Sequence, residues 1–203
     1  MKERPILLNA PMVRALLAGT KTQTRSIVKA RDLEWMDVHQ GLREPDNAER
    51  CPYGQPGDRL WLRESWSPDP PDVDGWGYAA WAGCREGQIA GVPERFRHPR
   101  FCNYAADWLH GPIRWTPSIH MPRWASRITL EITRVRVERL QDIDLADALA
   151  EGISDTGALI LDSAGNEQGG PIAEYAVLWE QINGPGSWDE NPWVWAIEFR
   201  RLP

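Results

Sequence analysis

The stretch Leu17-Ala-Gly-Thr-Lys-Thr-Gln-Thr-Arg25 is the most informative part of this chain. The apolar residues before it predict a helix that ends at Gly19, because glycine readily takes the left-handed conformation that stops a helix. A tight polar turn then presents four side chains together: Lys21, Thr22, Thr24 and Arg25. Two cations and two hydroxyls suit an anionic or carbonyl-bearing ligand, although such a cluster is also typical of a solvated surface.

Charge is distributed unevenly along the 203 residues, whose net charge is −6. Residues 1–31 hold seven Lys or Arg and one acid, and residues 114–139 hold six Arg and two Glu. An acidic protein with two basic segments can concentrate an anion such as a nucleotide or RNA at one place. The alternative is that this sorting does not survive folding.

The cysteines and the hydropathy indicate a protein of the cytoplasm. Cys51, Cys84 and Cys102 lie far apart, and an odd count without a signal sequence favours reduced thiols. Cys102 follows His98 at a spacing that suits a metal, but no second ligand pair accompanies them, so no metal is expected. No apolar run approaches the roughly 20 residues of a membrane helix, so no membrane partner is expected.

Hydrophobic periodicity predicts an α+β fold around a small mixed β-barrel with flanking helices. Asn9 is the expected N-cap of the helix that Gly19 ends. Further helices are predicted at 144–153 and 172–182, and strands at 5–8, 59–66, 126–140 and 193–199. The alternation in 126–140 changes parity near Thr133-Arg134, which indicates a bulge. Residues 26–50 are expected to form a loop with a helical turn, and residues 154–170 a loop.

Residues 67–123 are rich in Pro, Gly, Asp and Trp and show little periodicity. The whole chain holds twelve tryptophans, and six of them lie among such turn residues, where they can line a pocket or fix loops. This segment is predicted to be a long loop-rich insertion into one domain that spans 1–203. Long irregular loops are a usual place for a binding lid.

These motifs together resemble the ASCH domain, a member of the PUA-like superfamily of small β-barrels. Its signature is matched here by Gly19 through Arg25, which read G-x-K-T-x-T-R, and Gly57-Asp-x-Leu60, the Glu-Gly end of the 144–153 helix and the closing Ile-Glu-Phe199 also correspond. The resemblance covers residues 1–66 and 124–203. The whole chain is similar to a longer form that phages and prophages often encode.

The resemblance implies an activity and three catalytic residues. Small bacterial members are amidohydrolases that remove the acetyl group from N4-acetylcytidine with a Lys, a Thr and a Glu. The matching positions are Lys21, Thr24 and Glu151. Other members have been described as RNA-binding or ribonucleolytic, so the domain does not fix the reaction. No metal or organic cofactor is implied.

Hydrolysis of an exocyclic amide needs a nucleophile, a base and donors for the oxyanion. We expect Thr24 to attack the acyl carbon, or to position a water that does so, with Lys21 as base and Glu151 to orient it or relay a proton. The alternative is a structural ion pair between Lys21 and Glu151 that joins helix to loop, with Thr24 capping the turn.

Further polar and aromatic side chains are candidates for binding the substrate. The set is Thr22, Arg25, Glu64, Trp66, Ser118, His120 and Arg123, with weaker candidates in Arg127, Tyr104, Asp107 and Trp108. The expected substrate is a nucleoside or RNA that carries an acylated cytosine. The alternative function is a non-catalytic module that binds RNA or a modified base, and a weaker one is a metal-independent ribonuclease.

Overall fold

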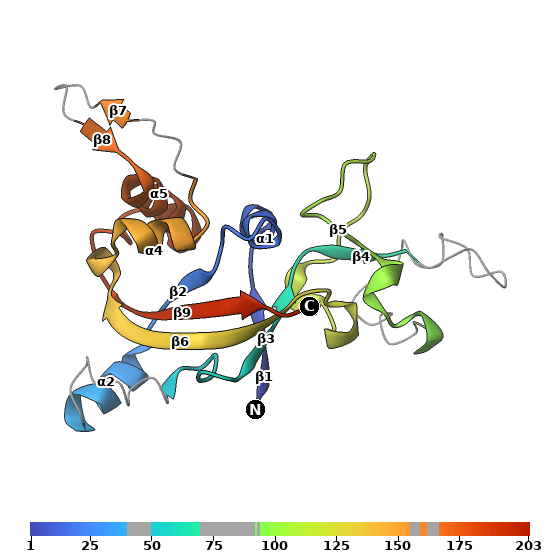
Figure 1. Ribbon diagram of the computed structural model, residues 1–203, viewed down its shortest axis with the longest axis horizontal. Coiled ribbons are helices and arrows are strands. Elements are labelled where there is room, and N and C mark those ends of the chain that lie inside the picture. The colour runs from blue at the N-terminus through green and yellow to red at the C-terminus, as the bar shows by residue number, and fades with distance from the viewer. Residues whose placement is uncertain (40–49, 70–91, 93, 155–158, 162–166) are drawn as a thin grey trace.

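A five-stranded mixed sheet forms the centre of the protein (Figure 1). The computed structural model describes residues 1–39, 50–69, 92, 94–154, 159–161 and 167–203. From edge to edge the strands are β1 (Glu3–Leu7), β3 (Arg59–Arg63), β6 (Thr129–Arg139), β9 (Trp193–Arg201) and β2 (Gln23–Ile27). β1 and β3 are parallel, and the other neighbouring pairs are antiparallel.

In the described part of the chain, four α-helices and two small two-stranded sheets accompany this sheet. The helices are α1 (Ala10–Leu17), α2 (Ala30–His39), α4 (Leu145–Ala150) and α5 (Pro171–Asn183). The small sheets are β4 (Trp66–Pro68) with β5 (Cys102–Tyr104), and β7 (Leu159–Leu161) with β8 (Glu167–Gly169). Short 3-10 turns occupy Glu94–Phe96, Pro99–Phe101, Ser118–His120, Arg123–Ala125 and Leu140–Asp142. In Figure 1, α4 and α5 lie beyond one end of the long strands, and β4 and β5 lie toward the other end.

The sheet curves strongly because its longest strand is bulged. The pairing of β6 with β9 shifts register between Ile132 and Arg134, which confirms the irregularity predicted near Thr133-Arg134. Apolar side chains of β1, β3, β6, β9 and α1 form the main core. The α+β class with a mixed sheet is therefore confirmed. Among the described residues no pairing joins β1 to β2, so the sheet is open between these two edges.

The opening helix follows the prediction closely. The Asn9 side chain accepts a hydrogen bond from the Met12 amide at 3.0 Å, and Gly19 takes φ +80° just beyond the helix end. The helix 144–153 is likewise capped by Asp144, which accepts from Asp147, and ended by Gly152 at φ +89°. Both helices therefore begin and end through local side-chain chemistry.

The segment after Gly19 differs from the predicted polar turn. Residues Gln23–Ile27 form β2, which pairs with β9 along its whole length. Lys21, Thr24 and Arg25 are buried. The prediction of a polar turn was wrong. Carboxylates from distant parts of the chain neutralise Lys21 and Arg25, so this segment can be buried.

Two further stretches contain more regular structure than predicted. The 26–50 segment includes the end of β2 and all of α2, and residues 40–49 lie outside the described part. The 154–170 segment includes β7 and β8. β9 does not alternate between buried and exposed residues, because Val194 through Ile197 are all buried; Val194 belongs to one core cluster, and Trp195 and Ile197 belong to another. No helix in the described residues is long and apolar enough to cross a membrane.

Candidate functional site

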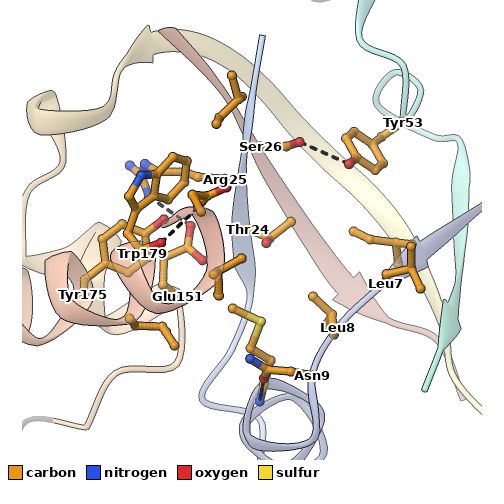
Figure 2. Close-up of a pocket in the computed structure, with 16 residues that line it drawn as sticks. Leu7, Leu8, Asn9, Thr24, Arg25, Ser26, Tyr53, Glu151, Tyr175 and Trp179 are labelled. Atoms are coloured by element: carbon orange, nitrogen blue, oxygen red, sulfur yellow. Dashed lines mark hydrogen bonds and ion pairs between the residues drawn. The ribbon is translucent and has the colours of Figure 1, made fainter. Parts of the chain in front are cut away.

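A cavity of about 370 Å³ lies where the sheet stays open between β1 and β2. The end of β1 and the residues after it form one wall, with Leu7, Leu8 and Asn9. Thr24 through Ile27 of β2 form another wall. The remaining lining comes from Ile6, Met12, Tyr53, Glu151, Tyr175, Leu178, Trp179, Ile182 and Asn183. In Figure 2, Thr24 lies between the Glu151–Tyr175 side and the Leu7–Leu8 side.

Glu151 is the acidic residue of this lining and forms a buried ion pair. Lys21 Nζ lies 2.8 Å from Glu151 Oε2 and also donates to the Glu151 carbonyl oxygen at 2.9 Å. The side chains of Lys21 and Glu151 are 0% and 1% exposed. Residues 21 and 151 also form a β-bridge, so backbone and side chains fix the same contact. The helix-to-loop ion pair considered as the alternative is present.

Gly152 makes this contact possible. A Cβ at this position would lie 2.8 Å from Ala15 Cβ and 3.0 Å from Lys21 Cβ, and the residue takes φ +89°. Both the close approach and the left-handed conformation require glycine. The end of α4 is thereby seated directly against α1 and Lys21.

Arg25 binds the second oxygen of Glu151 and connects it to two further acids. Its Nη1 lies 3.2 Å from Glu151 Oε1, and its Nη2 lies 2.6 Å from Glu138 and 2.7 Å from Asp147. Arg136 contacts these two acids as well, each at 3.1 Å, and also Glu198. The Arg25 side chain is 0% exposed. Arg25 thus binds three carboxylates of the protein. The sequence had instead predicted that this residue binds the substrate.

Opposing effects set the pKa of Asp147 in this charge network. Burial acts to raise the pKa, but the positive charges of Arg25 and Arg136 outweigh it and hold the pKa below its ordinary value. Asp147 therefore stays ionised and continues to hold Arg25 in place against Glu151.

Thr24 lines the cavity beside this network but is not bonded to it. Thr24 and Glu151 both line the cavity. Lys21 is not part of the lining, but it contacts Glu151. In the described part of the chain, neither Lys21 nor Glu151 hydrogen-bonds the Thr24 hydroxyl. Thr24 and Glu151 thus line one cavity, and Lys21 is paired with Glu151. A bound substrate or a water molecule would be needed to connect the Thr24 hydroxyl to this pair.

Aromatic side chains supply much of the remaining lining. Tyr53 donates or accepts a hydrogen bond with Ser26 at 3.1 Å, as Figure 2 shows. Tyr175 and Trp179 lie 6.2 Å apart between ring centroids on α5. Burial raises the pKa of Tyr175, so its hydroxyl stays protonated. Tyr175 and Trp179 are buried residues of the helix predicted at 172–182, but the sequence pattern gave no sign that they line a cavity. Tyr53 and Ser26 were missed altogether.

Two other candidates lie at a second cavity, of about 340 Å³, which shares Leu7, Leu8 and Asn9 with the first. Glu64 and Ser118 line it. Glu64 accepts two hydrogen bonds from Arg127, at 2.9 and 3.0 Å. Burial raises the Glu64 pKa, an effect that outweighs the opposing one of Arg127.

The remaining candidates lie elsewhere. Trp66 is fully buried and packs edge-on against Trp124 at 5.5 Å, so its side chain belongs to a core cluster and lines neither cavity. Arg123 binds Glu3 at 2.8 and 2.9 Å. Thr22 is exposed and contributes its backbone to the Ala150 and Phe199 hydrogen bonds.

His120 and the weaker candidates line neither of the two cavities. His120 closes a 3-10 turn. Trp108 packs edge-on against Trp115 at 6.0 Å. Tyr104 donates to the Ala125 carbonyl oxygen at 2.8 Å, and the Arg127 guanidinium lies 3.9 Å from its ring centroid. Trp108, Tyr104 and Arg127 thus contact other parts of the protein itself.

In the described residues, no group of three or more His, Cys, Asp or Glu side chains is arranged so that it could hold a metal ion. Cys51 and Cys102 are free and buried, and burial raises the pKa of the first to about 11 and of the second to about 12. Cys84 lies outside the described residues.

Comparison with protein-family models, with curated proteins and with solved structures finds no match to this chain.

Proposed function

We propose that this protein is an amidohydrolase of the ASCH type that removes the acyl group from the exocyclic amine of an N4-acylated cytidine. One observation carries the proposal: a threonine hydroxyl and a buried carboxylate line a single cavity, and a lysine ammonium lies 2.8 Å from that carboxylate. A nucleophile beside a proton-transferring pair is what acyl transfer requires.

In this mechanism the Thr24 oxygen attacks the acyl carbon, and its proton passes to the Glu151–Lys21 pair. The bond between the acyl carbon and N4 then breaks, and the pair returns the proton to the departing cytosine amine. Water hydrolyses the resulting Thr24 ester, which releases the carboxylic acid and restores the hydroxyl. Catalytic contacts often tighten only when substrate is bound, which accommodates the unbonded Thr24 hydroxyl of the free protein.

The lining of the cavity favours an uncharged, partly aromatic ligand. Tyr53, Tyr175 and Trp179 offer rings for packing against a base. Arg25 and Lys21 are already neutralised by Glu151 and its neighbours, so no unpaired cation among the described lining residues awaits a phosphate. The volume lies within the range of ordinary small-molecule sites. A nucleoside fits these features better than a nucleotide.

We also infer that the curved sheet is a PUA-like barrel whose seam is the β1–β2 opening. The bulge in β6 supplies the bend that a small barrel needs, and the cavity occupies the remaining gap. A cytoplasmic location follows from the nucleoside substrate under this proposal, and phage or prophage origin follows from the resemblance alone.

The direct test is incubation of the purified protein with N4-acetylcytidine and a series of longer N4-acylcytidines, followed by chromatography of the products. We expect release of cytidine by the wild type and none by Glu151→Gln, which keeps the shape of the side chain but removes its charge. Circular dichroism of the variant shows whether the fold is retained. Absence of cytidine release from every substrate would overturn the proposal.

A further inference from the structure

The second cavity lies beside the first and opens at the same end of the sheet. β1 and β3 are parallel neighbours, so the residues that follow them emerge side by side. Leu8 and Asn9 follow β1, Glu64 and Ser65 follow β3, and the Leu8 amide donates to the Arg63 carbonyl oxygen at 3.4 Å. Leu7, Leu8 and Asn9 line both cavities. A ligand lying across this short segment reaches both.

Glu64 is the charged group of the second cavity. The residue is 2% exposed, yet it lines the cavity. Arg127 binds its two oxygens from one side, and a carboxylate has about four acceptor positions. The remaining positions are available to donors that enter from the cavity.

The surroundings of Glu64 favour neutral donors over anions. Arg127 is shared between Glu64 and Asp107, so two acids meet one cation there. An entering phosphate would meet a net negative charge. The other polar side chains of this lining are Asn9, Ser65 and Ser118, which are neutral hydrogen-bonding groups. Two neighbouring hydroxyl groups of a ligand suit this lining, because both can donate hydrogen bonds to the one carboxylate.

We propose that the second cavity is a vicinal-diol subsite, in which Glu64 accepts hydrogen bonds from the 2′- and 3′-hydroxyls of a ribose whose base occupies the first cavity. This inference rests on the proposed function, and it goes further by assigning the sugar to a defined place. It makes the protein selective for ribonucleosides and gives Glu64 a role in binding and not in the chemical step.

Calorimetric binding of the reaction product tests the subsite without any turnover. The probes are cytidine and 2′,3′-dideoxycytidine, which lacks both hydroxyls. We expect the wild type to bind cytidine at least about 10-fold more tightly, since two hydrogen bonds to a charged acceptor are lost with the analogue. In Glu64→Gln the preference should fall to about 2-fold or less, with little change for the dideoxy compound.

Asp107→Asn is the matched control. Asp107 is the other partner of Arg127, its side chain is 52% exposed, and it lines neither cavity. This variant should keep the wild-type preference. Equal binding of the two probes by the wild type would overturn the subsite, as would a similar loss of preference in both variants, or binding of neither probe. Release of cytidine from N4-acetylcytidine is measured separately, so hydrolysis without a hydroxyl preference refutes the subsite and leaves the proposed function standing.

Discussion

Lys21 and Glu151 form one buried unit although they lie 130 positions apart in the chain. The resemblance of the motifs pointed to both residues, because each motif is a pattern of residue types at fixed spacing within a short stretch of sequence. The sequence could not show that their side chains meet, nor that Arg25 would turn away from a ligand toward three acids. Such contacts depend on long-range packing, for which no local pattern exists. The structural and the catalytic interpretations of the pair are compatible, because a proton-transferring pair must itself be held in place.

Replacement of Lys21 tests the structural part of this role. Lys21→Met removes the ammonium but keeps the apolar stem, and leaves Glu151 with Arg25 as its remaining cation. Loss of one partner of a buried pair typically costs about 3 kcal/mol or more, and we expect a loss of about 3 kcal/mol in the free energy of unfolding. Urea denaturation measures it, with the exposed Lys29→Met as control. A variant as stable as the control would contradict the role of the ion pair in stability.

Asp147 gives the charge network a defined acid sensitivity. Its pKa is held below the ordinary value of 3.8, so its contribution to stability is fully present above pH 3.8 and is lost as the pH falls through the lower value of the folded state. We expect the melting temperature of Asp147→Asn to depend less on pH below 3.8 than that of the wild type. The exposed Asp189→Asn serves as control. Parallel acid profiles for wild type and Asp147→Asn would refute the assignment.

At the scale of elements, α1 and α4 were predictable and β2 was not. Asn9, Gly19, Asp144 and Gly152 are caps and terminators whose chemistry is local, so the sequence shows where both helices begin and end. β2 is polar and lacks an apolar face. It becomes a strand because β9 supplies its hydrogen bonds and acids of β6 and α4 neutralise Arg25.

Gly152 tests how closely α1 and α4 are packed. Gly152→Ala adds a methyl group 2.8 Å from Ala15 Cβ and also strains a left-handed backbone. Gly184→Ala is the matched control, since it has φ +102° and no atom within 4 Å of the added group. Backbone strain costs both variants about 1–2 kcal/mol, and overpacking costs Gly152→Ala about 1–3 kcal/mol more. Equal losses in chemical denaturation would show that α4 can move away from α1 freely.

At the scale of the whole molecule, part of the positive charge of the two basic segments is neutralised within the fold. Arg25, Arg123, Arg127 and Arg136 each bind acids of the protein itself. These four cations are therefore not free to concentrate an anion, as the charge pattern of the sequence had suggested. The cavity lies where the described sheet is open between β1 and β2, and its charged lining residues, Arg25 and Glu151, are paired within the protein.

Salt dependence separates an enzyme for uncharged nucleosides from a module that binds RNA. We expect kcat/KM for N4-acetylcytidine to change by less than about 2-fold between about 50 and about 500 mM NaCl, because no phosphate is neutralised on binding. Fluorescence anisotropy with a single-stranded RNA gives the comparison. Tight RNA binding that weakens steeply with salt would favour the RNA-binding alternative.

The measurement that tests the central claim most directly compares Thr24→Ser with Thr24→Val in hydrolysis of N4-acetylcytidine. Serine keeps the hydroxyl and valine keeps the shape, and both should melt close to the wild type because Thr24 makes no side-chain hydrogen bond to the Lys21–Glu151 pair. We expect Thr24→Ser to keep kcat within about 10-fold of the wild type and Thr24→Val to fall to the uncatalysed background, since only the first retains a nucleophile. Turnover by Thr24→Val at the wild-type rate would contradict the account.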